Sequence, residues 1–129
     1  MTEATTEYDQ IVRVLQLYIE GDAKGDREKL REAFHQDARM FGSVGTTRYH
    51  VPIAEFIDMA VAMPADTGSY QGRVTSVTQV GDAAVAVVAE DGCWGNVSFV
   101  DFFSLSRIDG IWKIVNKSFA HTGGDLPAE

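Results

Sequence analysis

The stretch "LYIEGDAKGDREKLREAFHQDARMFG", residues 17–42, decides the fold because its pattern changes from helix to strand along its length. Apolar residues recur at steps of three and four from Thr6 to Asp22, which predicts an amphipathic helix. Gly21 and Gly25 bracket the end of this helix, and Asp26 is placed to cap a second, shorter one. The letters "HQDA" end that second helix, and "RMFGSVG" has the composition of a short strand. This stretch therefore predicts two helices that lead directly into a sheet.

The sequence after this stretch predicts one more helix and then a series of strands. The segment "TTRYHV" is a second strand or its connection, and Pro52 suits the first turn of a third helix, which ends before Pro64. Period-two patterns then predict four strands: "YQGRVTSVTQV", "AAVAVVAE", "WGNVSFVDFFSLSRI" and "IWKIVNKSFAH". Tight turns between them are expected at residues 81–82, 91–92 and 109–110. This order predicts an α+β fold with its helices on one face of an antiparallel sheet.

Length, composition and charge limit the possible functions. The 129 residues, 45% of them apolar, predict one globular domain over residues 1–129 that ends in a frayed tail at 122–129. The net charge of −8, with its basic residues scattered, argues against binding to nucleic acid or to an anionic membrane. The sequence has no apolar run of transmembrane length, and its acidic N-terminus is unlike a secretory signal. We therefore expect a cytoplasmic protein.

Metal and cofactor chemistry finds little support in the sequence. The single cysteine, Cys93, excludes an internal disulfide and gives no thiolate cluster. The histidines His35, His50 and His121 have none of the spacings typical of metal ligands. We expect His35 to cap the carbonyls at the end of the second helix. His121 follows the last strand, where it is either a surface residue or an acid–base group. No metal and no cofactor are predicted.

The segments "LYIEGDAKGDREKLREAFHQDARMFG", "IAEFIDMAV" and "GIWKIVNKSFAH" together resemble the nuclear transport factor 2-like superfamily. Within it, the chain is most similar to the small SnoaL-like proteins of the "putative lumazine-binding" family. The resemblance implies a cone-shaped, strongly curved sheet wrapped around three helices, with a pocket at its open end. It also implies a homodimer formed through the outer face of the sheet. The superfamily holds isomerases, cyclases, dehydratases and binding proteins, so the fold does not determine the function.

Ketosteroid isomerases of this superfamily use a helix tyrosine, a carboxylate base and a protonated aspartate. The resemblance places Tyr18 at the tyrosine, but the base falls on Gly42, which has no side chain. The aspartate falls near Phe102 or Phe103, with Asp101 close by. A shift of one residue in this alignment would turn Asp101 to the other face of the sheet. Asp101 is either an acid of the pocket or the partner of a lysine on the neighbouring strand, such as Lys117.

The faces of the last two strands are only partly decided by alternation. In the resembling proteins the tryptophan and isoleucine of the last strand point into the cone, which implies that Asn116 and Ser118 also point inward and that Lys113 and Lys117 point outward. Both faces of the strand over residues 93–107 are mostly apolar, so either face could line the pocket. Candidates for a dimer interface are Phe99, Phe103, Val115 and Phe119.

Two functions are consistent with the sequence. The first is a domain that binds a small apolar or planar ligand in the cone; its candidate contacts are Tyr18, Met40, Phe56, Trp94, Trp112, Asn116, Ser118 and His121. The second is an acid–base enzyme, similar to a polyketide cyclase, isomerase or dehydratase, that acts on a hydrophobic ring compound. No catalytic residue is assigned from the sequence.

Overall fold

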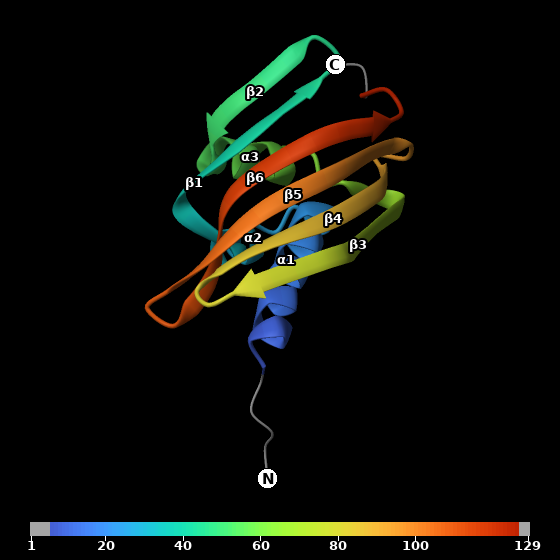
Figure 1. Cartoon of the computed structure of the whole chain (residues 1–129). Coiled ribbons are helices and arrows are strands. Elements are labelled where there is room, and N and C mark those ends of the chain that lie inside the picture. Colours follow the sequence, from blue (N-terminus) through green and yellow to red (C-terminus); the bar gives the residue numbers. More distant parts are fainter. Residues whose placement is uncertain (1–5, 127–129) are drawn as a thin grey trace.

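Within residues 6–126, which the structure describes, three helices lie against one face of a curved six-stranded sheet (Figure 1). The structure is a computed structural model. Its elements are α1 (Glu7–Lys24), α2 (Arg27–Ala33), β1 (Phe34–Val44), β2 (Thr47–Pro52), α3 (Ile53–Ala62), β3 (Asp66–Val80), β4 (Ala83–Cys93), β5 (Val97–Ile108) and β6 (Ile111–Gly123). The predicted α+β architecture is confirmed. None of the helices in this range is both long and apolar enough to cross a membrane.

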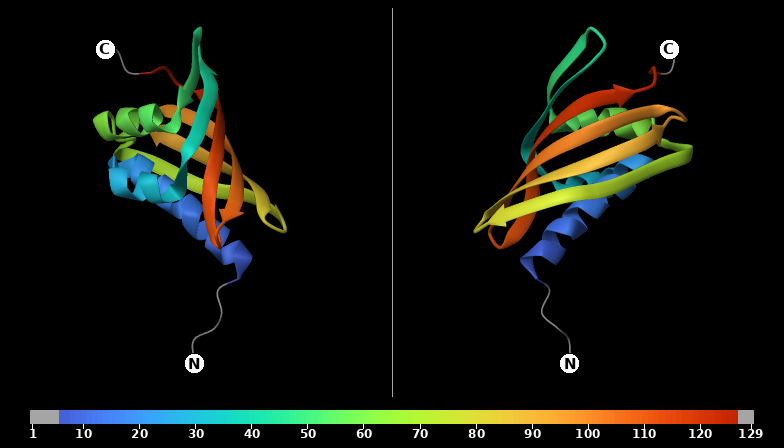
Figure 2. Two further views of the ribbon diagram at one scale, coloured as in Figure 1. Left: turned by 90° about the vertical axis from the view of Figure 1, so that its left-hand side faces the viewer. Right: turned by 45° about the vertical axis from the view of Figure 1, so that its right-hand side comes forward.

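The strand order in the sheet is β2-β1-β6-β5-β4-β3. The pair β1 and β6 is parallel, and the other neighbouring strands are antiparallel. This parallel pair places the first strand of the chain beside the last one. The sheet curves around the helices, with all three on its concave side (Figure 2).

Local capping fixes the ends of α1 and α2, and the cap predicted at Asp26 is confirmed. The Thr6 hydroxyl accepts a hydrogen bond from the Asp9 amide at 3.0 Å, and the Asp26 carboxylate accepts one from the Lys29 amide at 3.2 Å. Gly25 ends α1 in the left-handed conformation, at φ 67°, and its amide donates to the Gly21 carbonyl. A side chain at Gly25 would also meet Pro64, because the added Cβ would lie 2.8 Å from the Pro64 ring.

The core lies between the helices and the concave face of the sheet. The fully buried apolar side chains include Ile11, Leu15, Leu30, Val88, Leu105 and Ile114. Burying one such side chain contributes roughly 1.5–3 kcal/mol to the stability of the fold. The core fixes the orientation of α1 against β4, β5 and β6, and so determines where the polar residues on these elements meet.

A β-bulge in β6 changes which of its residues point inward. Ile114 pairs with Leu105 and Asn116 with Ser104, so Val115 is an extra residue in the ladder. Before the bulge, Ile114 is buried; after it, Lys117 is buried. The expectations that Asn116 and Ser118 point inward, and that Lys117 points outward, are therefore wrong. One inserted residue reverses the alternation of the residues that follow it, here as far as His121, after which the register of β6 shifts again.

Three predicted boundaries also differ from the structure. The letters "HQDA" belong to β1, because α2 ends at Ala33. The turn expected at residues 91–92 lies instead at Trp94 and Gly95, both with positive φ, while Asp91 and Gly92 belong to β4. The strand β6 continues to Gly123, so the tail begins later than residue 122; residues 127–129 lie outside the described range.

Candidate functional site

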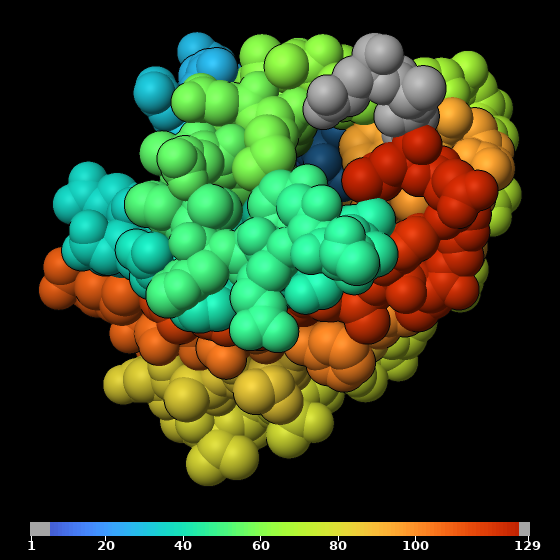
Figure 3. Space-filling model, turned by 90° about the horizontal axis from the view of Figure 1, so that it is seen from above, coloured from blue at the N-terminus to red at the C-terminus, as the bar shows by residue number. Residues whose placement is uncertain are grey.

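A cavity of about 390 Å³ lies at the open end of the cone, between α1, α3 and the inner face of the sheet. Figure 3 shows the hollow between α3, the β1–β2 hairpin and the end of β6, with atoms of α1 (blue) at its bottom. Pockets that bind small molecules occupy about 300–1,000 Å³, so this cavity could hold a compact ligand. Its lining consists of Tyr18, Asp22, Met40, Val44, Tyr49, Phe56, Met59, Ala60, Ala62, Met63, Ala65, Glu90, Cys93, Trp94, Phe99, Lys117, Phe119 and Leu126.

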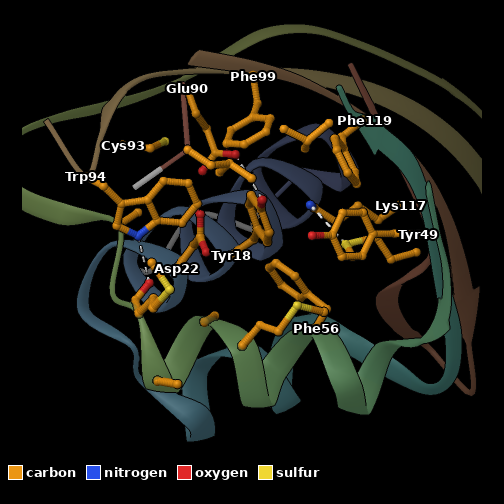
Figure 4. Close-up of a pocket in the computed structure, with 18 residues that line it drawn as sticks. Tyr18, Asp22, Tyr49, Phe56, Glu90, Cys93, Trp94, Phe99, Lys117 and Phe119 are labelled. Carbon is orange, nitrogen blue, oxygen red and sulfur yellow. Dashed lines mark hydrogen bonds between the residues drawn. The ribbon is translucent and has the colours of Figure 1, made fainter. Parts of the chain in front are cut away.

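The walls of the cavity are aromatic and sulfur-containing. Phe56 and Met59 come from α3, and Phe99 and Phe119 come from β5 and β6 (Figure 4). The expectation that Phe99 and Phe119 form a dimer interface is wrong, because both point into the cone. Phe103, expected there too, is a core residue with 2% exposure. The inward face of β5 is therefore the face that carries Phe99, Asp101 and Phe103. Alternation in the sequence alone did not decide between the two faces.

The deep end of the cavity is formed by a buried polar cluster. The Tyr18 hydroxyl, on α1, lies 3.0 Å from Oε2 of Glu90 on β4 and 2.9 Å from Oδ2 of Asp101 on β5. The Tyr70 hydroxyl donates to Oε1 of Glu90 at 2.6 Å. The side chains of Tyr18, Glu90 and Asp101 are all at most 2% exposed. Tyr18 and Glu90 line the cavity, whereas Asp101 lies behind them.

The hydrogen bonds of this cluster require one proton on a carboxyl group in addition to the proton of the Tyr18 hydroxyl. A tyrosine hydroxyl has a single proton to donate, yet Tyr18 lies within hydrogen-bond distance of carboxyl oxygens from both Glu90 and Asp101. The second contact is a good hydrogen bond only if one of the two carboxyl groups is protonated and donates to the tyrosine oxygen. The geometry therefore favours a carboxyl pair that shares one proton.

The electrostatics of the cluster agree with a retained proton. Burial, together with the charge of Asp22, raises the pKa of Glu90 to about 7. Burial and the nearby charge of Glu90 raise the pKa of Asp101 well above its usual value. Burial also raises the pKa of Asp22. Carboxyl groups so close together cannot all ionise at neutral pH without strong repulsion, so the group titrates as a unit.

Lys117 supplies a positive charge to this cluster. Its Nζ lies 3.6 Å from Oδ1 of Asp101, and the two side chains are 6% and 1% exposed. The same nitrogen lies 4.3 Å from the centre of the Phe56 ring and 4.9 Å from that of Phe119, which gives it cation–π contacts. The expected pairing of Asp101 with Lys117 is confirmed, but it lies inside the cone, because the bulge in β6 turns Lys117 inward.

Gly42 has a packing reason to lack a side chain. A Cβ added there would lie 2.4 Å from the Phe119 ring, which covers Gly42 from the neighbouring strand. The position at which the resemblance puts the isomerase base is thus closed by an aromatic ring. Any base in this cavity must come from other elements, and Glu90 and Asp22 are the carboxyl groups that line it.

The structure divides the residues predicted to contact a ligand. Those that line the cavity are Tyr18, Met40, Phe56 and Trp94. At the rim, the Trp94 indole donates a hydrogen bond to the Met63 carbonyl at 3.0 Å. Those outside the lining are Trp112, Asn116, Ser118 and His121.

Each residue outside the lining has a clear location. Trp112 is a core residue whose indole donates to the Glu7 carboxylate at the start of α1. The Asn116 amide donates to the Ser118 hydroxyl at 3.3 Å on the outer face. His121 lies with its Nε2 2.9 Å from the Gly123 carbonyl. These side chains therefore contact other parts of the protein and do not reach a ligand in the cavity.

Among residues 6–126, no histidine lines the cavity. His35 does not cap α2, because its Nδ1 accepts a hydrogen bond from the Asp37 amide at 3.0 Å within β1. His50 stacks on Phe41 on β1, with ring centres 4.4 Å apart. The acid–base groups that line the site are therefore carboxyl, hydroxyl, thiol and amine groups.

Sequence reasoning missed Asp22, Glu90 and Lys117. For Glu90 a signal existed, because it occupies the same alternating positions as Ala84, Ala86 and Val88, which are buried. A carboxylate in phase with buried alanine and valine residues indicates a functional or paired acid. No comparable signal marks Asp22, at the end of an amphipathic helix, or Lys117, which the bulge turns inward.

Comparison with known proteins places the chain in a family. The family model described as "Putative lumazine-binding" matches residues 6–120. A nuclear transport factor 2-like protein of unknown function from Methylobacillus flagellatus KT is 35% identical, with a TM-score of 0.83 over 94% of this chain and 96% of that one. A similar protein of unknown function from Shewanella baltica OS155 is 31% identical, with a TM-score of 0.82 over 95% and 98%.

A curated relative has a named activity. The aldolase FrzH from Cladobotryum sp is 24% identical over 115 residues, which are 89% of this chain and 91% of that protein. From the family match over residues 6–120 and the two similar structures, the chain belongs to the "putative lumazine-binding" family of the nuclear transport factor 2-like superfamily.

Proposed function

We propose that this protein is a small acid–base enzyme that binds a compact, largely apolar carbonyl compound and moves a proton at the carbon next to the carbonyl group. The observation that carries the proposal is the position of Glu90, which is buried at the deep end of a largely apolar cavity, beside Tyr18 and Lys117.

The walls of the cavity define the ligand. Phe56, Phe99, Phe119 and Trp94 offer ring faces and edges, and the methionines adapt to irregular shapes. A cavity of about 390 Å³ with such walls suits a hydrophobic ring compound, which is the ligand expected from the sequence. The carboxyl group of Glu90 and the hydroxyl group of Tyr18 lie at the deep end, so the polar atom of the ligand would be directed there.

The polar groups divide naturally into an acceptor and two donors. Glu90 is suited to accept the proton, because a general base works best when its pKa is near the operating pH, and its pKa is raised to about 7. The Tyr18 hydroxyl and the Lys117 ammonium group are suited to stabilise the negative charge that forms on the carbonyl oxygen. Asp101 is a positioning residue, since it contacts both Tyr18 and Lys117 from behind the cavity.

The name of the curated relative supports a reaction of this kind. An aldol addition begins with loss of a proton from the carbon next to a carbonyl group, and an aldol cleavage ends with a proton returning to that carbon. FrzH is named an aldolase. The match to FrzH extends over 115 residues, which are 89% of this chain.

Exchange of hydrogen for deuterium tests this proposal. We would incubate the protein in D₂O with 2-tetralone, a ring ketone with acidic hydrogens next to its carbonyl, and follow exchange by NMR. Wild-type protein should accelerate exchange, and Glu90→Gln should abolish the acceleration. The control Glu55→Gln alters an exposed carboxylate on α3 and should behave as wild type. Binding of 2-tetralone without any acceleration would contradict the enzyme and leave the pocket as a ligand-binding site.

We further propose that the chain forms a homodimer through the outer face of its sheet. On this face Val85 and Phe102 are 56% and 50% exposed, and Val87 pairs with Phe102 across β4 and β5. Exposed apolar side chains on adjacent strands favour contact with a second surface. This face replaces Phe99, Phe103 and Phe119, which were first expected at the interface but line the cavity or belong to the core. Val115, the fourth residue expected there, is the half-buried bulge residue of β6.

A further inference from the structure

We propose that Lys117 is a covalent catalytic residue, whose amine forms an imine with the carbonyl group of an aldehyde or ketone held in the cavity. This inference rests on the proposed function for the class of ligand, and it adds a reaction that the acid–base groups alone do not require. Lysine amines in apolar pockets are the groups that form Schiff bases with carbonyl substrates.

The first support is the location of the amine. Lys117 lines the cavity while its side chain is only 6% exposed, so its amine faces the ligand site rather than bulk water (Figure 4). The other lysines lie elsewhere: Lys24 and Lys29 form exposed ion pairs with Asp66 and Glu20, and Lys113 donates to the Glu32 carbonyl.

The second support is that the amine is loosely held. Its polar neighbours in the described part of the chain are Oδ1 of Asp101 and the Met40 sulfur, both at 3.6 Å. Hydrogen bonds from an ammonium group to a carboxylate are usually about 2.7–2.9 Å long. Within residues 6–126, the buried Oδ1 of Asp101 has no hydrogen-bond partner. The amine is therefore held by one weak hydrogen bond, to the Met40 sulfur, and by one long ion pair, which restrain it less than a close carboxylate contact would.

The third support is the supply of proton acceptors. An ammonium group must lose a proton before its nitrogen can attack, and Asp101 and Glu90 form a pair of carboxyl groups that already shares a proton. In the reaction the nitrogen forms a bond to the carbonyl carbon, and the carbonyl oxygen takes up protons and leaves as water. The balance is an ammonium ion and a carbonyl compound giving an iminium ion and water.

The product also suits the site. The iminium ion keeps one positive charge at nearly the same place, so its pairing with Asp101 and its contacts with Phe56 and Phe119 are retained. No oxidant, metal or other reactant is needed. The apolar walls keep bulk water from the imine and so slow its hydrolysis.

Reductive trapping with benzaldehyde tests the inference. Benzaldehyde fits an aromatic cavity and has no hydrogen next to its carbonyl group, so its imine forms independently of any proton transfer at carbon. We would add sodium cyanoborohydride, which reduces imines to stable amines, and locate the adducts by peptide mass spectrometry. Lys117 should be labelled first, Lys113→Arg should keep this adduct, and Lys117→Arg should lose it while retaining the folded circular dichroism spectrum.

The outcomes separate this inference from the proposed function. Absence of an adduct on Lys117 at aldehyde concentrations that label the exposed Lys24 and Lys29 overturns the covalent role. Labelling of Lys117 no faster than that of Lys113 overturns it as well. If wild-type protein accelerates 2-tetralone exchange while Lys117 resists labelling, the acid–base groups act without an imine, and only the covalent step fails.

Discussion

Glu90→Gln should make the protein more stable at alkaline pH and leave it nearly unchanged at acidic pH. Burial raises the pKa of Glu90 from 4.5 to about 7, so the folded chain holds this proton more tightly than the unfolded chain. The stabilising effect of that proton is complete below pH 4.5 and is lost as the pH rises through about 7. A glutamine side chain is neutral throughout and keeps an oxygen that can accept from Tyr70 or Tyr18.

The magnitude follows from the shift in pKa. One pKa unit corresponds to about 1.4 kcal/mol, so a change from 4.5 to about 7 amounts to about 3 kcal/mol in the free energy of unfolding. Most of this change falls between about pH 5 and about pH 8. Because Glu90 titrates together with Asp101, part of the effect is shared between the two carboxyl groups.

The free energy of unfolding is measured by urea unfolding at about pH 5 and about pH 8, at constant protein concentration. The three proteins compared are wild type, Glu90→Gln and the control Glu55→Gln. The difference in stability between Glu90→Gln and wild type should grow with pH in favour of the variant. The control should follow wild type, because Glu55 is exposed. A Glu90→Gln variant whose stability changes with pH just as that of wild type does would refute the argument that a buried proton is held at Glu90.

Three further changes test other parts of the structure. Gly42→Ala should lower stability by about 1–3 kcal/mol in thermal unfolding, because its new methyl group would overlap the Phe119 ring; a neutral result would show that the ring moves freely. Tyr18→Phe should cost about 1–3 kcal/mol, because buried carboxyl oxygens lose their partner, whereas Tyr8→Phe on the exposed face of α1 should cost little. Phe102→Asp should convert a dimer to a folded monomer in light scattering, and an unchanged mass would place any dimer contact elsewhere.

Features set by neighbouring residues could be predicted from the sequence. The caps at Thr6, Asp26 and Gly25 depend on side chains and backbone angles within one turn. The cap at Asp26 was predicted at the correct residue, and Gly25 was one of the two glycines expected to bracket the end of α1. The order of elements followed from periodicity for the same reason. The turn expected at residues 91–92 was misplaced, because Asp91 and Gly92 continue β4 beside β3 instead of reversing the chain.

The site depended on information that local patterns do not contain. The direction of Lys117 follows from the extra residue Val115, and a bulge is defined only by the register of two paired strands. The role of Asp101 could be framed but not decided, because both faces of β5 are mostly apolar. Glu90 was detectable by its phase with buried residues, yet only the fold shows that it meets Tyr18, which lies 72 residues earlier in the chain.

The pH dependence of 2-tetralone exchange tests the central claim most directly, because it reads the protonation state of the proposed base during the reaction. The account predicts that the protein-dependent rate rises as the cluster loses its proton and levels off above an apparent pKa of about 7, the value to which burial raises the pKa of Glu90. Glu90→Gln should remove this protein-dependent rate at every pH. A rate that is the same with wild type, with Glu90→Gln and with buffer alone would contradict the claim.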